Sequence, residues 1–363
     1  TPTRSSRLFI CSDCNHAFTQ TEFEDSTFYT DNYSLLLNDF FEDQALFISS
    51  DRIEQRNRYQ AQLMAQIIRD ITPENALEIG SGKGLTSYHL LKEICGINVT
   101  LQDPGTELYS EMWTKFLPNC TFVATLDELK GARFDLIYSF FVLEHVTSPK
   151  DYLAAALERL DDDGVFLACV PDVQMNHGDL LVSDHLRHFT LSSLRGLLKR
   201  HVPEGFSWYT WRDEALRAII FLISRSTISN FPYLPKANNT SCLPLYEDAV
   251  DCLWITDRAN ELTANLDNRE VIFWGSSFYA RLVELITHLK PTRVVDGNSD
   301  FQGKNYETQD GKYIEIESPD SLTNIDSAAS VIIPCMSPLA AKNLIASLDA
   351  PQRSVLKQLF FSE

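Results

Sequence analysis

A glycine-rich turn is the part of this sequence whose residue types are best suited to holding a ligand. The apolar run Ala76–Ile79 predicts a short buried strand, and apolar positions from Leu85 onward predict a helix. Three glycines lie between them: Gly80, Gly82 and Gly84. Because glycine has no Cβ, the backbone N–H groups of such a turn can approach a ligand closely. A strand, a glycine turn and a helix form half of a nucleotide-binding βαβ unit, although such a run can also be only a tight turn.

Two carboxylates favour the ligand-binding interpretation. Glu78 lies inside the apolar run, where an unpaired carboxylate is costly to bury. Asp103 follows Gly84 by 19 positions, just after the next predicted strand at residues 97–101. At that place a carboxylate can meet the hydroxyl groups of a ribose.

The spacing Glu-x-Gly-x-Gly-x-Gly resembles that of the class I S-adenosylmethionine-dependent methyltransferases, in which an acidic residue stands two positions before the first glycine. The resemblance implies S-adenosyl-L-methionine as the cofactor, with the glycine turn under its methionine part and Asp103 on its ribose. The cofactor-binding residues that it implies are Glu78, Gly80, Ser81, Gly82, Gly84, Asp103 and Phe140. Lys83 departs from the small or acidic residue more usual at its position, but this position lies in a loop.

A second stretch with chemical potential spans residues 183–194. It follows a predicted strand and precedes a helix that Thr190 can cap, which places His185 and His188 on a loop at the ligand-binding end of the sheet. A carboxylate near a histidine can orient the ring and raise its basicity, as a general base requires. Asp184 is adjacent to His185, and adjacent side chains do not normally bond each other, so Asp184 is also a candidate for holding a substrate or a backbone group. The alternative is that both histidines are structural residues at the start of the helix.

The segment 134–146 carries a further polar pair. Ligands of open α/β sheets bind beyond the carboxyl ends of the strands, so residues 139–141 are expected beside the cofactor or substrate. Glu144 and His145 follow them. They are interpreted either as catalytic residues or as a pair that holds the loop. His145, like His188, is expected to line the substrate site.

The chain as a whole resembles the multidomain C-methyltransferases of sugars and small molecules, whose corresponding loop has an acidic residue and a histidine before Phe-Ser/Thr-Leu. The resemblance implies His185 as the catalytic base, with Asp184 beside it, in C-methylation of a sugar-like or nucleotide-linked small molecule. One alternative is O-methylation, with the same histidine deprotonating a hydroxyl. Another is a non-catalytic cofactor-binding or interaction module. An NAD-dependent dehydrogenase is disfavoured by Glu78 and by the hairpin predicted below.

Alternating strands and helices must position these residues. The predicted strands of the main domain are 76–79, 97–101, 121–124, 134–139 and 165–170. Their alternation with helices, among them 85–95 and 149–160, predicts a parallel sheet with right-handed crossovers. Two apolar runs, 206–211 and 218–224, predict an antiparallel hairpin. The predicted fold class is therefore α/β: a Rossmann-like methyltransferase sheet closed by an antiparallel hairpin, plus a second, smaller Rossmann-like domain.

Four segments are predicted along the chain. They are an N-terminal Cys-x-x-Cys segment at 1–50, an S-adenosylmethionine-binding methyltransferase domain at 51–225, a linker and connecting helix at 226–268, and a C-terminal Rossmann-like domain at 269–363. In the last, a strand at 271–274, a turn at Gly275 and Asp296 repeat the plan of the main domain with only one of the expected glycines. Substrate binding and a purely structural use are both open for it.

The N-terminal segment contains half of a zinc-binding pattern. Cys11 and Cys14 have the spacing that lets two thiolates point at one metal ion, and a tetrahedral site needs four ligands. Further candidates are His16, the distant Cys242 and Cys252, and residues upstream of the given sequence. The alternative is two free thiols on a hairpin, and no metal ligand is assigned from the sequence.

Composition limits the partners. The 363 residues carry a formal net charge of −19 and lack the clustered Lys and Arg that a broad nucleic-acid surface needs. No apolar run reaches the ~18–20 residues of a membrane span, and no signal peptide is recognised. The cysteines are mostly scattered, as is typical of reduced thiols. We therefore predict a cytoplasmic enzyme with a small-molecule substrate and no nucleic-acid or membrane partner, and we make no prediction of its oligomeric state.

Overall fold

The structure of the chain is a computed structural model. It describes residues 6–11, 13, 16–21, 39–49, 52–182, 184–226, 231, 233–235, 266, 269–276, 278–323, 325–326, 329–336, 344–345 and 348. The chain divides into two units, Thr1–Tyr246 and Glu247–Glu363. Cys14, Cys242 and Cys252 and most of the predicted linker and connecting helix lie outside the described residues.

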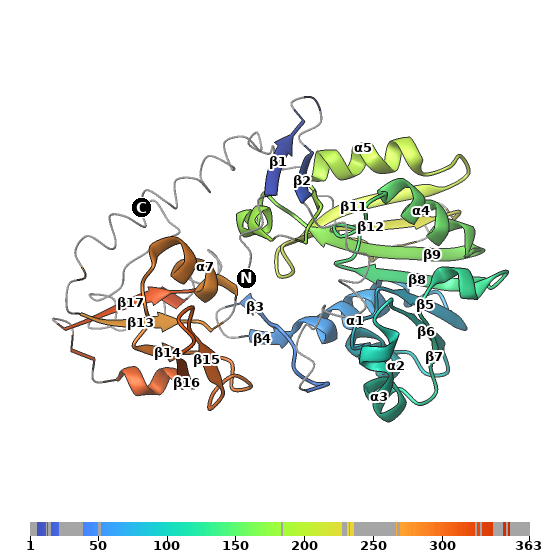
Figure 1. The fold of residues 1–363 in the computed structure, drawn as a ribbon. Coiled ribbons are helices and arrows are strands. Elements are labelled where there is room, and N and C mark those ends of the chain that lie inside the picture. Colours follow the sequence, from blue (N-terminus) through green and yellow to red (C-terminus); the bar gives the residue numbers. More distant parts are fainter. Residues whose placement is uncertain are drawn as a thin grey trace. The chain divides into compact units, whose positions relative to one another are not determined.

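A seven-stranded sheet forms the centre of the first unit, in the order β11-β12-β9-β8-β5-β6-β7 (Figure 1). Its strands are β5 (Asn75–Ile79), β6 (Asn98–Gln102), β7 (Thr121–Val123), β8 (Phe134–Phe140), β9 (Leu160–Pro171), β11 (Ser207–Asp213) and β12 (Ala218–Ser224). Strands β5 to β9 pair in parallel, and β12 pairs antiparallel with both β9 and β11. The prediction of an α/β fold with a large, mostly parallel sheet is confirmed.

Helices cover both faces of this sheet because apolar strand residues, which point alternately to opposite sides, must be buried on both faces. Ala76, Leu136 and Tyr138 pack in one core, and Leu77 and Ile137 pack in the other. The first core includes residues of α1 (Arg56–Ile67), α2 (Leu85–Glu93) and α3 (Thr106–Phe116). The second includes residues of α4 (Pro149–Glu158) and α5 (Leu191–His201). Helix α3 was not among the predicted helices.

The strand order reverses between β5 and β8. From β5 the chain builds β6 and β7 on one side and then crosses back to place β8 on the other. Ligands of open α/β sheets bind at such a reversal, beyond the carboxyl ends of the strands. The glycine turn that follows β5 and the segment that follows β8 therefore share one edge of the sheet.

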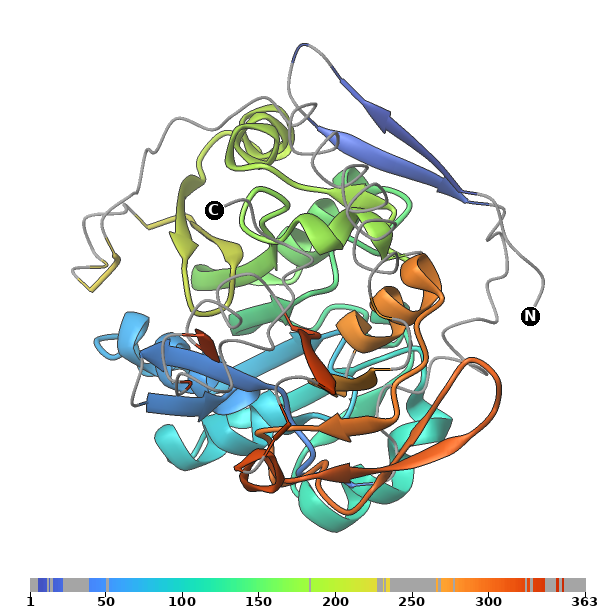
Figure 2. The same ribbon diagram turned by 90° about the vertical axis from the view of Figure 1, so that its left-hand side faces the viewer.

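The N-terminal strands pair with the loop before α5. Strands β1 (Ser6–Ile10) and β2 (Ala17–Thr21) form an antiparallel hairpin, the pair of dark-blue arrows at the upper right of Figure 2. Strand β2 also pairs with β10 (Arg187–His188). A further hairpin joins β3 (Ala45–Ser49) to β4 (Arg52–Gln55). Short 3-10 helices lie at Leu126–Leu129 and His177–Leu181.

The second unit contains a five-stranded sheet in the order β15-β16-β14-β13-β17. Its elements are β13 (Glu270–Trp274), α7 (Phe278–Thr287), β14 (Arg293–Val295), β15 (Asn305–Glu307), β16 (Tyr313–Glu317), a 3-10 helix (Pro319–Leu322) and β17 (Ser330–Pro334). Strand β13 pairs in parallel with β14 and β17, and β15 pairs antiparallel with β16. The strands β15 and β16 were not predicted.

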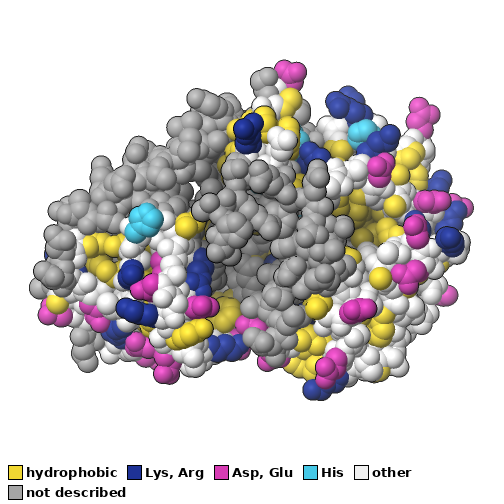
Figure 3. Space-filling model, in the orientation of Figure 1, with side chains coloured by type: hydrophobic (Ala, Val, Ile, Leu, Met, Phe, Trp, Pro, Cys, Tyr) yellow, Lys and Arg dark blue, Asp and Glu magenta, His cyan; other side chains and the backbone are white. Residues whose placement is uncertain are grey.

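On the face of the first unit that Figure 3 shows, acidic and basic side chains lie interspersed with hydrophobic ones. Within the described part of the chain, no helix is both long enough and apolar enough to cross a membrane.

Candidate active site

The glycine turn after β5 is held open at the carboxyl end of the sheet. The N–H groups of Gly80 and Ser81 donate to the carbonyl of Gln102, at 2.8 and 3.0 Å. Gly80, Gly82 and Gly84 have φ angles of 70, 49 and 75°, in the left-handed region that favours glycine. A Cβ on Gly82 would meet no atom of the described residues within 4 Å, whereas one on Gly80 or Gly84 would collide with packed side chains. The turn therefore offers open space at Gly82.

Asp103, just beyond the end of β6, braces this turn. Its Oδ2 accepts a hydrogen bond from the N–H of Gly82, and its Oδ1 accepts one from the N–H of Gly105, both at 2.8 Å. Burial raises the pKa of Asp103, although the two backbone hydrogen bonds oppose that rise. A carboxylate offers about four lone-pair positions, so Asp103 keeps acceptor capacity for hydroxyl groups of a ligand.

Glu78 lies beneath the turn inside the sheet. Its side chain is 4% exposed, and its Oε2 accepts a short hydrogen bond from the hydroxyl of Ser87 in α2. The same hydroxyl lies 2.5 Å from the phenol oxygen of Tyr138 in β8. Burial raises the pKa of Glu78 to about 8. In contrast to the expected contact with the cofactor, this placement makes Glu78 a link between β5, α2 and β8.

The turn fits a polar ligand. The hydroxyl of Ser81 is buried and has no hydrogen-bond partner among the described residues, although buried polar groups normally have one. This hydroxyl, the space at Gly82 and the carboxylate of Asp103 belong to one short loop system. Together they are suited to the amino, carboxyl and ribose groups of a nucleoside-type cofactor.

Lys83 ties a distant segment to the turn. Its Nζ donates to the carbonyls of Asp39 (2.8 Å) and Glu42 (2.6 Å). The residue that departs from the expected loop pattern therefore has a structural function. Sequence reasoning missed this contact because backbone acceptors more than forty positions away leave no sequence signal.

The end of β8 lies beside the turn. The hydroxyl of Ser139 donates to the carbonyl of Ile79 at 2.9 Å and accepts from the phenol of Tyr152 at 2.5 Å. Phe140 is partly buried, and Phe141 has a φ of 60°, which is unusual for a bulky residue. Backbone conformations of this kind cluster at binding sites, which makes Phe141, with its neighbour Phe140, a candidate for the edge of the ligand region.

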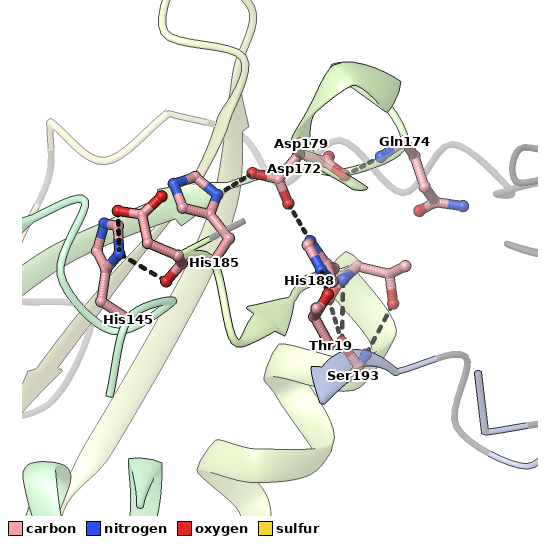
Figure 4. A network of polar contacts seen from close by, with 10 residues as sticks. Thr19, His145, Asp172, Gln174, Asp179, His185, His188 and Ser193 are labelled. Carbon is pink, nitrogen blue, oxygen red and sulfur yellow. Dashed lines mark hydrogen bonds and ion pairs between the residues drawn. The ribbon is translucent and has the colours of Figure 1, made fainter. Parts of the chain in front are cut away.

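Asp179 is the centre of a polar network on the loop after β9 (Figure 4). It lies in the 3-10 helix His177–Leu181 and is 1% exposed. Its Oδ1 lies 2.5 Å from Nδ1 of His185, and its Oδ2 lies 2.7 Å from Nδ1 of His188. The Nε2 of His188 lies 2.6 Å from the hydroxyl of Thr19 in β2. One carboxylate thus orients both His185 and His188.

The acidic partner of His185 is Asp179, not the adjacent Asp184. The Nδ1 of His145 lies 3.0 Å from the carbonyl oxygen of Asp184 and 3.4 Å from its Oδ2. The rings of His145 and His185 meet edge to face with centroids 4.7 Å apart. Asp179 precedes His185 by six positions, and only the fold of the loop brings the two together. No spacing pattern in the sequence could have selected it.

His188 occupies a structural position. It is fully buried, and its two ring nitrogens face Asp179 and Thr19. This geometry leaves no ring nitrogen for a substrate, in contrast to the expected substrate contact. His188 instead fastens the loop to the N-terminal hairpin.

Glu144 is a buried residue whose carboxyl group lies near His145 and His185. It is 0% exposed, and neither of its oxygens has a hydrogen-bond partner among the described residues. Burial raises the pKa of Glu144 to about 8, although the nearby His185 opposes this rise. One ligand atom from each of Glu144, His145 and His185 lies within 4.8 Å of the others.

The two histidines of this group differ in basicity. Burial lowers the pKa of His185, but the hydrogen bond and charge of Asp179, with the charges of Glu144 and Asp184, outweigh it and raise this pKa to about 9. Burial and the charge of His185 lower the pKa of His145. The group therefore combines a strongly basic ring with a weakly basic one.

Residues 52–219 match the family model of a methyltransferase domain. The chain therefore contains a methyltransferase domain. The matched residues include the glycine turn, Asp103, Asp179, His185 and His188. The cofactor of this domain is S-adenosyl-L-methionine, and Ser81, Gly82 and Asp103 are suited to hold it. No curated protein sequence matches the chain.

Several solved structures share this arrangement of strands and helices at low similarity. The plantazolicin methyltransferase BpumL in complex with SAH is 15% identical, over 47% of this chain and 85% of that chain, with a TM-score of 0.41. The mitomycin 7-O-methyltransferase MmcR is 20% identical, over 47% and 54%, with a TM-score of 0.38. An O-methyltransferase family protein from Burkholderia thailandensis is 11% identical, over 47% and 57%, with a TM-score of 0.38. These similarities are too low to carry an argument about the acceptor.

Proposed function

We propose that this methyltransferase acts on a small molecule and methylates a carbon atom of a sugar-like or nucleotide-linked acceptor, with His185 as the general base. The observation that carries the proposal is the contact of 2.5 Å between Nδ1 of His185 and Asp179. The resemblance of the whole chain to the C-methyltransferases of sugars and small molecules supports the acceptor class.

The donor would be held by Ser81, Gly82 and Asp103. When bound, S-adenosylmethionine supplies a methyl group on a sulfonium centre that is already activated for displacement. The protein then has to align the acceptor with this methyl group and to keep water out of the line between them. Phe140 and Phe141 lie at the end of β8, where they can shield that line.

A carbon acceptor becomes nucleophilic when it loses a proton next to a carbonyl group. The Nδ1 of His185 faces Asp179, so Nε2 is the ring nitrogen that would take this proton. The buried carboxylate of Asp179 stabilises the imidazolium that forms. We assign the contact with the acceptor to His145 because its ring packs edge to face with that of His185.

Hydrogen exchange on the acceptor tests this function directly. A nucleotide-linked keto-sugar is incubated with the protein and S-adenosylhomocysteine in heavy water, and proton NMR follows the signal of the acidic C–H. We expect exchange with the wild type, and in His185→Gln a reduction of exchange and of methyl transfer by about 10²–10⁴-fold. Binding of S-adenosylmethionine by calorimetry should be retained. His201→Gln, at the end of α5, is the matched control.

The other outcomes separate the alternatives. A methyl ether formed without C–H exchange would support O-methylation. Unchanged turnover in His185→Gln would contradict the base assignment. Cofactor binding with no transfer to any acceptor would support the non-catalytic module.

A further inference from the structure

We infer that Glu144, His145 and His185 form a binding site for a divalent transition-metal cation. Two imidazoles and one carboxylate are a ligand set that such cations take up in proteins. One ligand atom from each residue lies within 4.8 Å of the others. Nitrogen and oxygen ligands lie about 2.1 Å from an ion of this class, so the ligand atoms of a tetrahedral site are about 3.4 Å apart. A shortening of these distances by at most about 1.4 Å brings the three side chains to that geometry.

Glu144 gives an independent indication of a ligand. The carboxyl is 0% exposed, and both oxygens are without a hydrogen-bond partner among the described residues. Burying a carboxyl group without partners is costly, and such groups in proteins normally bond a side chain, water or an ion. The nearby ring atoms of His145 and His185 place a cation within reach of this carboxylate.

The partners of the two rings are those that metal-binding histidines require. The Nδ1 of His185 bonds to Asp179 at 2.5 Å, and the Nδ1 of His145 lies 3.0 Å from the carbonyl of Asp184. Histidine ligands normally bond a carboxylate or carbonyl through the nitrogen that does not face the metal, which fixes ring orientation and increases the basicity of the ligating atom. Both rings are therefore fixed in the manner of ligands.

Three protein ligands leave coordination positions open for another molecule. The catalytic meaning of this site rests on the proposed function, whereas ion binding itself does not. A ring nitrogen of His185 that is bound to an ion cannot take a proton from the acceptor. The base catalysis of the proposed function therefore belongs to the ion-free protein, and a bound ion would inhibit it by occupying this nitrogen.

Cobalt binding tests this inference with the full chain. The protein is dialysed against Co²⁺, the bound metal is counted by mass spectrometry, and the visible absorption spectrum is recorded. We expect bound Co²⁺ with ligand-field bands in the wild type. We expect the same result in the double variant Cys11→Ser/Cys14→Ser, which lacks these two thiolate ligands. In Glu144→Gln and in His145→Gln we expect the affinity to fall at least tenfold. Glu204→Gln and His201→Gln are the matched controls.

Absence of bound Co²⁺ in the wild type overturns the inference however the variants fold, and calorimetry with S-adenosylhomocysteine reports whether each variant keeps its donor site. The inference is overturned if no ion binds, if binding disappears with the two cysteines, or if folded Glu144→Gln binds Co²⁺ as the wild type does. Exchange of the acceptor C–H in chelator-treated protein distinguishes the two proposals. If no ion binds but His185-dependent exchange persists, the metal site is wrong and the proposed function stands.

Discussion

The two units of this chain contain the same arrangement of a turn and a carboxylate. In the first, Asp103 accepts from the N–H of Gly82 at 2.8 Å. In the second, Oδ2 of Asp296 accepts from the N–H of Ser276 at 2.8 Å and from its hydroxyl at 2.7 Å. Both carboxylates follow the strand that pairs in parallel with the strand before the turn. By this contact alone, either unit could be taken for the ligand-binding one.

The glycines of the two turns, Gly82 and Gly275, distinguish the two units. In the part of the chain that the structure describes, a Cβ on Gly82 would meet nothing within 4 Å, whereas a Cβ on Gly275 would lie 2.4 Å from the carbonyl oxygen of Cys335. The first glycine leaves room beside the turn, and the second lets two backbone segments pack together. The comparison shows that a glycine after a strand indicates binding only when the space that it leaves is open.

The largest effect that we expect is on the stability of the second unit. Gly275→Ala combines a φ of 109° with the collision against Cys335 and should lower the free energy of unfolding by about 2–4 kcal/mol. The control is Gly303→Ala, with a φ of 78° but open space, which should cost about 1–2 kcal/mol. Urea unfolding followed by tryptophan fluorescence measures both. Equal losses would mean that packing against Cys335 is not what requires the glycine.

The next effect concerns donor affinity. Asp103→Asn removes the charge that accepts from the turn and that we propose to bind the ribose, and hydrogen bonds to charged groups contribute about 1.5–3 kcal/mol. We therefore expect about 10–100-fold weaker binding of S-adenosylhomocysteine by calorimetry. Asp296→Asn, the corresponding change in the second unit, should leave this affinity unchanged. A loss in Asp296→Asn as large as in Asp103→Asn would contradict the division of roles.

A smaller effect should appear with pH. The position two residues before the turn is Glu78 in the first unit and Phe273 in the second. The folded-state pKa of Glu78 is about 8, above its usual value of 4.5, so the folded chain holds a proton that the unfolded chain releases. Its stabilising contribution is complete below pH 4.5 and is lost as pH rises through 8.

Wild type should therefore lose stability relative to Glu78→Gln as the pH rises from 5 to 8, by an amount on the order of 1–3 kcal/mol. Unfolding in urea at several pH values measures this difference. Parallel pH curves for the two proteins would show that Glu78 is ionised in the folded state.

The smallest effect that we expect tests the link between the N-terminal hairpin and the site. Thr19→Val keeps the side-chain shape but removes the hydrogen bond to His188, which is worth about 0.5–1.5 kcal/mol. We expect kcat to fall two- to tenfold because His188 and His185 share Asp179, with the KM for S-adenosylmethionine unchanged. Steady-state kinetics separate the two parameters. An unchanged kcat would mean that the hairpin does not help to position His185.

The sequence predicted those features that depend on local pattern. The run after Ala76, its glycines and the position of Asp103 follow from spacing and strand alternation, and the parallel sheet follows from regular alternation of strands and helices. The contacts that decide the site do not follow from pattern. Asp179 reaches His185 only through a folded loop, and Glu144 is distinguished only because its carboxyl has no hydrogen-bond partner among the described residues. Helix α3 was missed although Tyr109 and Trp113, four positions apart, form its buried face.

The most direct test of this account is calorimetric titration of the full chain with S-adenosylhomocysteine. We predict one equivalent bound, abolished by Gly82→Val, which fills the open space of the turn, and unaffected by Asp296→Asn. Binding that survives Gly82→Val, or a second equivalent that Asp296→Asn removes, would contradict the assignment of the donor site to the first unit.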